Sequence, residues 1–311
     1  MEILKLIPAC KDYLWGGTRL KTEFGKNFVG EKLAETWELS THEAGASIIA
    51  EGKDSGRSLP SYIEKYGKEI LGTRCQKFEH FPILIKLIDA KDNLSIQVHP
   101  DNEYAKKYEK DYGKTEFWYV VDCEEGAYLY YGFSKTISKG KLRDRIENQT
   151  LLEVLNKVQV KKGDSFFIEA GTIHAIGAGI LIAEIQQSSN VTYRVYDYGR
   201  VGADGKQREL HIDKALDVIY TAPIEKEYDF GAHLGVSDYF IVDKLDLDGT
   251  YSDCVSEESF LSILVLDGTL TVKTKDDVKT AVKGDSLMLL ANSGEYCLEG
   301  KADVIMTVVG K

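Results

Sequence analysis

The stretch Val160-Lys161-Lys162-Gly163-Asp164-Ser165-Phe166-Phe167-Ile168 returns later in the chain as Ala281-Val282-Lys283-Gly284-Asp285-Ser286-Leu287-Met288-Leu289. A second similar pair precedes these two, Tyr119-Val120-Val121-Asp122 and Val265-Leu266-Asp267. The offset is 121 residues in the first pair and about 145 in the second, a difference that a helical stretch near 134–157, inserted only in the first copy, explains. Strands followed by Gly-Asp are common, so chance is the alternative. Together, however, the matches predict two related β-barrels, the second of them simpler.

Strands dominate the pattern on both sides of the repeat. Apolar runs between turn residues predict strands at 81–89, 93–99, 158–185 and, as short pieces, through the last eighty or so residues, with a hairpin at 116–133. Helical spacing predicts helices at 58–71, 138–157 and from about 212. We therefore predict a mainly β protein with two jelly-roll barrels and a few helices inserted in or flanking the first. The expected domains are residues 1–225, with helical insertions at about 58–71 and 138–157, and residues 226–311.

Composition limits the partners of the chain. The 311 residues carry a formal net charge of −11, which disfavours nucleic acid as a partner. An anionic substrate would need a local basic cluster in so acidic a protein.

The cysteines and the apolar runs of the sequence indicate the compartment and whether the chain spans a membrane. The five cysteines are scattered without a CxxC pair, which indicates free thiols in a reducing compartment. The N-terminus is too short and too charged for a signal peptide, and no apolar run reaches the roughly 18 residues that a membrane span needs. We therefore expect a cytoplasmic protein without a membrane partner.

Four polar residues form the constellation that carries chemistry. Residues i and i+2 of a strand point to the same face, so Gln97 and His99 reach the same side. Glu116 begins the next predicted strand, and His174 ends the segment Gly163-(five residues)-Glu169-Ala170-Gly171-Thr172-Ile173-His174. Either histidine alone would be an ordinary strand-end residue. Two imidazoles, a carboxylate and an amide oxygen together suit a borderline divalent metal. Zinc is favoured, while Fe(II), Mn(II) and Co(II) stay open by ligand type.

This arrangement resembles the two cupin motifs, of which the first supplies HxH and then Glu, and the second reads GxxxxxPxGxxH. Here Gln97 replaces the first His of the pair, and Glu169 replaces the motif Pro. In the second copy Glu295 stands where the first has His174, and Asn292 replaces Gly171. The C-terminal cupin-like barrel is therefore expected to lack metal ligands, which leaves one metal site per chain.

Several further segments resemble the type I, cupin-type mannose-6-phosphate isomerases in their compact bacterial form. They are Tyr13–Gly17, Ala34–Glu38, Phe81–Asp101, Gly113–Glu116 and Glu184–Arg194. The resemblance covers most of residues 1–215 and implies a metal-dependent aldose–ketose isomerase that interconverts mannose 6-phosphate and fructose 6-phosphate through an enediolate. It also implies that Gln97, His99, Glu116 and His174 are the ligands of one Zn²⁺.

The remaining candidates surround this predicted metal site. The resemblance makes Arg194 the active-site arginine, which would stabilise the enediolate or bind the phosphate, since a guanidinium suits both tasks. Lys114 lies two residues before Glu116, so it should point into the same cavity. Some larger members have Lys where Arg200 stands, and arginine is no base at neutral pH. The change is therefore harmless if this position acts by charge, whereas a proton-transfer role would have to lie elsewhere. Glu184 is a candidate base or an orienting group for Arg194 or a ligand, and Trp15 a candidate for lining the sugar pocket.

Two other functions compete with the isomerase. A non-catalytic sugar-binding or regulatory cupin would be expected to lose Arg194 or Lys114, and both are present. A cupin dioxygenase could hold Fe(II) with two His and a Glu, but Gln97 and the basic cluster argue against it. A bifunctional isomerase–nucleotidyltransferase is disfavoured by length. The expected partner is a phosphorylated hexose, and the sequence leaves a homodimer open.

Overall fold

The computed structural model describes residues 2–202 and 205–311. The backbone divides into two compact units, one made of residues 1–12, 18–87 and 230–311 and the other of residues 13–17 and 88–229. The first unit therefore combines both ends of the chain, whereas the sequence predicts two consecutive domains divided at 225/226. That division stays a prediction. No helix in the described part of the chain is long and apolar enough to cross a membrane.

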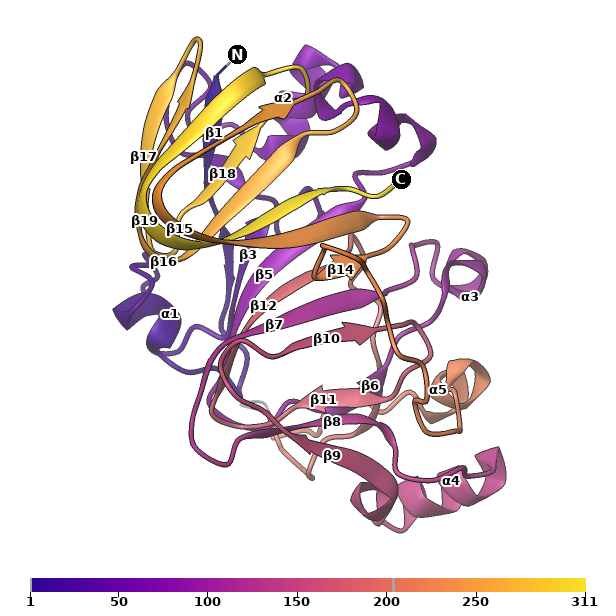
Figure 1. Ribbon diagram of the computed structural model, residues 1–311. Helices are drawn as coiled ribbons and strands as arrows, with labels where there is room; N and C mark the ends of the chain where they lie inside the picture. Colours follow the sequence, from indigo (N-terminus) through magenta and orange to yellow (C-terminus); the bar gives the residue numbers. More distant parts are fainter. Residues whose placement is uncertain (1, 203–204) are drawn as a thin grey trace. The chain divides into compact units, whose positions relative to one another are not determined.

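The first unit is built mainly on an eight-stranded antiparallel sheet with the order β14-β15-β19-β16-β18-β1-β4, in which β17 also pairs with β16 (Figure 1). Its elements are β1 Ile3–Ile7, β2 Ala9–Lys11, α1 Arg19–Thr22, β3 Glu35–Leu39, β4 Ile48–Ile49, α2 Leu59–Tyr66, the 3₁₀ turns Lys68–Leu71 and Thr73–Lys77, β14 Gly235–Val236, β15 Phe240–Val255, β16 Leu261–Thr274, β17 Val278–Val282, β18 Ser286–Leu289 and β19 Gly294–Val309. Strand β5, Ile83–Ala90, runs from this unit into the second.

The second unit contains the strands β10-β7-β12 and a five-stranded sheet with the order β13-β6-β11-β8-β9. Its elements are β6 Ile96–Val98, α3 Asn102–Tyr108, β7 Glu116–Cys123, β8 Tyr128–Phe133, α4 Lys139–Glu147, the 3₁₀ turn Leu151–Val154, β9 Leu155–Gln159, β10 Ser165–Ile168, β11 His174–Ile176, β12 Ile180–Gln187, β13 Tyr193–Tyr196 and α5 Ile212–Val218. The mainly β fold class is confirmed.

The internal repeat appears as the same turn in both units. Gly163 and Gly284 have φ angles of 94° and 90°, a region that favours glycine. Gly163 N–H donates to the Val120 carbonyl at 2.9 Å, and Gly284 N–H donates to the Val265 carbonyl at 2.8 Å. In each copy the next residue, an Asp, accepts from the backbone N–H three positions earlier. These pairings reproduce the two sequence offsets, so the repeat is confirmed.

Three local predictions were wrong. The hairpin at 116–133 does not form, because β7 pairs with β10 and β12 whereas β8 pairs with β9 and β11. The helix at 138–157 ends at Glu147, and residues 155–159 form β9. The last eighty residues form strands of up to 16 residues rather than short ones, since Gly249 pairs with Gly300 and lets β15 and β19 bend without breaking (Figure 1).

Alternation in the five-stranded sheet positions the polar site. Ile96 and Val98 are fully buried in an apolar core that includes residues of α4 and α5. Gln97 lies between them and therefore points to the opposite face. The chain buries one face of this sheet under helices and leaves the other for polar side chains.

Candidate metal centre

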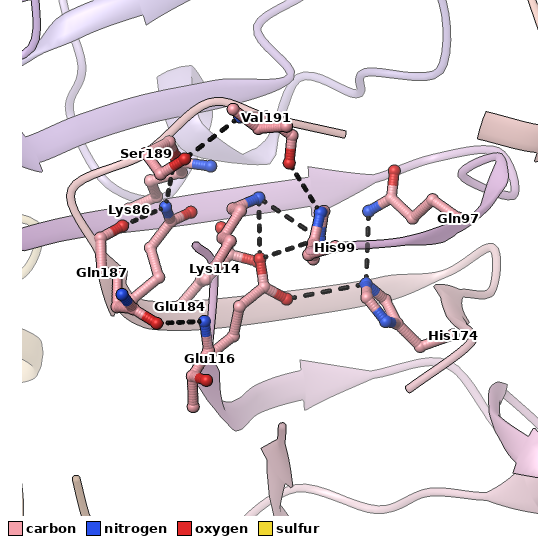
Figure 2. A network of polar contacts seen from close by, with 12 residues as sticks. Lys86, Gln97, His99, Lys114, Glu116, His174, Glu184, Gln187, Ser189 and Val191 are labelled. Atoms are coloured by element: carbon pink, nitrogen blue, oxygen red, sulfur yellow. Dashed lines mark hydrogen bonds and ion pairs between the residues drawn. The ribbon is translucent and has the colours of Figure 1, made fainter. Parts of the chain in front are cut away.

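Two histidines, one glutamate and one glutamine meet in the second unit, as Figure 2 shows. His99 and His174 have no exposed surface, and neither does Glu116. His174 lies directly opposite Gln97 in the β11–β6 register, so both side chains point to one face of the sheet. The ligand atoms of His99, Glu116 and His174 lie within 4.8 Å of one another. The structure thus brings together all four residues predicted as metal ligands.

Backbone carbonyls fix the orientation of both imidazoles. His99 Nδ1 lies 2.9 Å from the Val191 carbonyl oxygen, and His174 Nδ1 lies 2.9 Å from the Thr172 carbonyl oxygen. A carbonyl only accepts, so each Nδ1 carries the proton and each Nε2 presents a lone pair. Metal-binding histidines are oriented in this way in most proteins.

The spacing of the ligand atoms fits one cation. His99 Nε2 is 3.3 Å from Glu116 Oε1, and His174 Nε2 is 3.7 Å from Glu116 Oε2. The Gln97 amide lies 3.4 Å from His174 Nε2, and turning the amide over places its oxygen there. Two ligands of a tetrahedral zinc, each at about 2.05 Å, lie about 3.3 Å apart. In addition, neither carboxylate oxygen of Glu116 accepts a well-formed hydrogen bond, although both are buried.

Lys114 supplies a positive charge beside Glu116. Its ammonium lies 2.7 Å from Glu116 Oε1 and 3.5 Å from His99 Nε2. Burial alone would raise the pKa of Glu116, but Lys114, His99 and His174 together outweigh burial and hold that pKa well below its usual range. Burial, aided by Lys114, lowers the pKa of His99 to about 3, and burial also lowers the pKa of His174. At neutral pH the site therefore holds an ionised carboxylate and uncharged imidazoles.

Glu184 and Trp118 lie on strands of the same layer as Glu116. Glu184 pairs with Trp118 in the β12–β7 register, and Trp118 lies two residues after Glu116, so all three side chains share one face. Trp118 Nε1–H donates to Glu184 Oε2 at 2.8 Å, and its ring meets the His174 ring edge-on at 5.2 Å. Sequence reasoning missed Trp118, although the same spacing rule that placed Lys114 would have found it.

Arg194 lies opposite Gln97 in the β13–β6 register, which directs its side chain to the face that carries the ligands. Its guanidinium donates to the Glu209 carbonyl at 2.9 Å and to Ser95 Oγ at 3.3 Å. Burial, followed by the nearby guanidinium of Arg208, lowers the pKa of Arg194 below its usual value. It stays charged, because arginine titrates far above neutrality.

Arg200 and Arg208 share one buried carboxylate. Arg208 binds Asp197 through two hydrogen bonds of 2.8 and 2.6 Å, and Arg200 also binds Asp197 and donates to the Asn93 carbonyl at 2.6 Å. Burial opposes ionisation of Asp197, but the two arginines hold its pKa below the usual range. Sequence reasoning missed Arg208 and Asp197, because they lie eleven residues apart and no periodic pattern connects them.

Trp15 is buried in the 13–17 segment, 5.7 Å from the Tyr13 ring, and its carbonyl accepts a hydrogen bond from Asp92 N–H. Its place in a sugar pocket stays a prediction. In the C-terminal barrel Glu295 is exposed on β19, and His99, Glu116 and His174 form the one metal-like cluster among the described residues.

Comparison with known proteins gives a consistent family. Residues 3–127 match the phosphomannose isomerase type I catalytic domain, and residues 232–309 match the mannose-6-phosphate isomerase cupin domain. The chain is 37% identical to mannose-6-phosphate isomerase ManA of Bacillus subtilis over 98% of both chains. It is 44% identical to the Streptococcus mutans mannose-6-phosphate isomerase over 66% of this chain and 64% of that one.

Solved structures agree. A crystal structure of the mannose 6-phosphate isomerase from Bacillus subtilis superimposes with a TM-score of 0.91 at 34% identity, covering 99% of each chain. A zinc-bound mannose 6-phosphate isomerase shares the fold, with a TM-score of 0.79 at 17% identity over all of both chains.

Proposed function

Since this chain belongs to the type I mannose-6-phosphate isomerase family, we propose that it interconverts mannose 6-phosphate and fructose 6-phosphate. The observation that carries the proposal is the meeting of two Nδ1-anchored histidines with a buried, ionised glutamate. We propose further that Gln97, His99, Glu116 and His174 hold one Zn²⁺ per chain. When bound, a divalent cation polarises the hydroxyl and carbonyl oxygens of the sugar.

The chain's own residues would bind and orient the open sugar. Arg194 projects beside Gln97, so its guanidinium is proposed to stabilise negative charge on the enediolate oxygens. Lys114 adds a second positive charge beside Glu116, and its ammonium is proposed to bind the substrate and take part in catalysis. Arg200 is proposed to attract the phosphate, together with Arg208. The guanidiniums of Arg194, Arg200 and Arg208 outnumber the nearby carboxylates of Asp197 and Glu209, and the remaining positive charge would attract a phosphate monoester.

Glu184 is proposed to move the proton between C2 and C1. It is 4% exposed, shares a face with Glu116 and is held by Trp118. The competing role is purely orienting, in which Glu184 holds Trp118 against His174. Glu184→Gln separates the two, because glutamine still accepts from Trp118 but cannot take a proton. If Glu184 is the base, exchange of the C2 hydrogen with deuterated solvent should stop in this variant. If Glu184 only orients Trp118, that exchange should continue.

Two substitutions test the proposed function. His174→Ala should lose zinc and turnover together, whereas Arg194→Ala should keep zinc and lose turnover. His80→Ala, at a side chain that is 67% exposed, is the control and should change neither. Metal content by mass spectrometry and formation of fructose 6-phosphate are the measurements. Full turnover in a metal-free His174→Ala protein would rule out the scheme.

The proposal also covers the compartment, the partners and the domain organisation of the protein. All five cysteines are free, which supports a reducing compartment and hence the cytoplasm. The substrate partner would be a phosphorylated hexose, and a homodimer stays open. We also retain the division at 225/226 as a domain proposal, since the C-terminal cupin match begins at residue 232.

A further inference from the structure

A cavity lies in the first unit, at one end of the C-terminal barrel. It measures about 430 Å³ and is lined by residues of β15, β16 and β19, by the loop between β15 and β16, and by Arg74. The lining residues all belong to this unit, and the metal ligands all belong to the other. Ligand sites are frequent at the mouths of β-barrels.

At this cavity the side chains on the inward face of β15 change from apolar to polar. Leu245 and Leu247 pack on the apolar core of the barrel. The pairing of β15 with β19 runs from residue 240 to 255 without a register shift, so Asp243, Tyr251 and Asp253 share that face. A barrel interior is normally filled by apolar side chains, whereas here Asp243, Tyr251 and Asp253 line the cavity. Asp253 lies at the exposed end, and Asp243 is also paired with His233 Nδ1 at 2.7 Å.

The polar groups are held in place before any ligand arrives. Tyr251 O–H donates to Asp253 Oδ2 at 3.1 Å, and the Tyr251 and Tyr296 rings lie 6.4 Å apart. On the rim, Arg74 N–H donates to the Glu258 carbonyl at 2.9 Å, and the Arg74 guanidinium donates to the Val309 carbonyl at 3.2 Å. A preorganised rim lowers the ordering cost of binding.

The lining favours one class of ligand. Tyrosine rings offer apolar faces, and carboxylates accept hydrogen bonds from hydroxyl groups. Asp243, Asp253 and Glu258 would repel a phosphate. The two cations of the lining are already ion-paired, Arg74 with Glu258 and Lys244 with Asp246. We propose that this cavity binds an unphosphorylated, uncharged sugar of about one hexose unit, at a site separate from the metal centre. Affinity should be in the millimolar range usual for a small polar ligand.

Saturation-transfer NMR with methyl α-D-mannopyranoside tests the proposal on the full-length, zinc-loaded protein. This glycoside has no phosphate and cannot open its ring, so it is not an isomerase substrate. We expect saturation transfer to the glycoside that persists in excess fructose 6-phosphate and in His174→Ala. Tyr251→Ala and Asp253→Asn should each raise the dissociation constant, measured by titrating the glycoside, at least tenfold.

Asp248→Asn is the matched control, because Asp248 lies on the outer face of the same strand beside Lys301. It should bind the glycoside like the wild type, and thermal unfolding should show all variants folded. Three results would overturn the proposal: no transfer at 20 mM glycoside, transfer abolished by fructose 6-phosphate, or transfer unchanged in both Tyr251→Ala and Asp253→Asn. Isomerase activity is assayed separately, so failure of the cavity and failure of the proposed function are distinguishable.

Discussion

Replacing Lys114 by methionine tests how charge is balanced at the metal centre. The Lys114 side chain is 5% exposed and its ammonium lies 2.7 Å from the fully buried Glu116 carboxylate. At an effective dielectric constant of about 20, two unit charges at that distance attract by about 6 kcal/mol before desolvation is counted. Methionine keeps the apolar stem and removes the charge. Without a metal, Glu116 is then a buried charge without its ammonium partner, which costs about 3–5 kcal/mol of the free energy of unfolding.

Zinc should change that result. A divalent cation on Glu116 supplies the positive charge that the variant lacks. The variant's loss in free energy of unfolding should therefore be, in zinc-loaded protein, about half of its loss in metal-free protein or less. A difference of about 2 kcal/mol between the two states corresponds to zinc binding about 30-fold more tightly to the variant than to the wild type. Turnover should nevertheless fall, since Lys114 is proposed to act on the substrate.

Urea unfolding of both proteins, in EDTA and in zinc, provides the measurement. Lys106→Met, at an exposed position of α3, is the control and should change stability by less than about 0.5 kcal/mol in either state. Equal losses for Lys114→Met with and without zinc would refute the reasoning, since the metal would then not neutralise Glu116. A loss under about 1 kcal/mol in EDTA would refute the importance of the ion pair.

Three further predictions follow from single contacts. Asp197 has a lowered pKa, so its contribution to the free energy of unfolding is complete above about pH 4 and declines as the pH falls through the folded-state pKa. The loss of stability in Asp197→Asn, measured by urea unfolding, should therefore shrink below pH 4. A loss that does not change with pH would contradict this. Gly72→Ala should lower the unfolding temperature of the protein more than Gly56→Ala does. Both glycines have positive φ, but only at Gly72 would a Cβ lie 2.5 Å from the Glu258 carbonyl oxygen. Equal losses of stability in the two variants would contradict the clash. Gln97→Leu should weaken zinc at least tenfold in a chelator competition, and unchanged affinity would remove Gln97 from the ligand set.

The sequence predicted that Gln97, His99, Glu116 and His174 lie together, because part of this geometry follows from strand alternation. Gln97 lies between two buried apolar residues, which places its side chain on the opposite face, and Lys114 lies two residues before Glu116. The Gly163 turn and its later copy were visible because each needs glycine at positive φ. These features depend on residues close in sequence.

Features that depend on distant pairing were not predictable. Periodicity showed strands at 116–123 and 128–133 but not that they belong to different sheets, because short polar turns also join strands that switch sheets. The carbonyl of Val191, which orients His99, contributes through its backbone and leaves no side-chain signal. Likewise, nothing local in the sequence shows that Arg208 folds back onto Asp197.

The isomerase assay of the purified protein tests the central claim most directly. Conversion of mannose 6-phosphate to fructose 6-phosphate is measured before EDTA treatment, after it, and after zinc is returned. We predict activity that EDTA abolishes and zinc restores, because His99, Glu116 and His174 form the proposed metal site. Absence of activity in the zinc-loaded protein, or full activity after removal of the metal, would contradict the account.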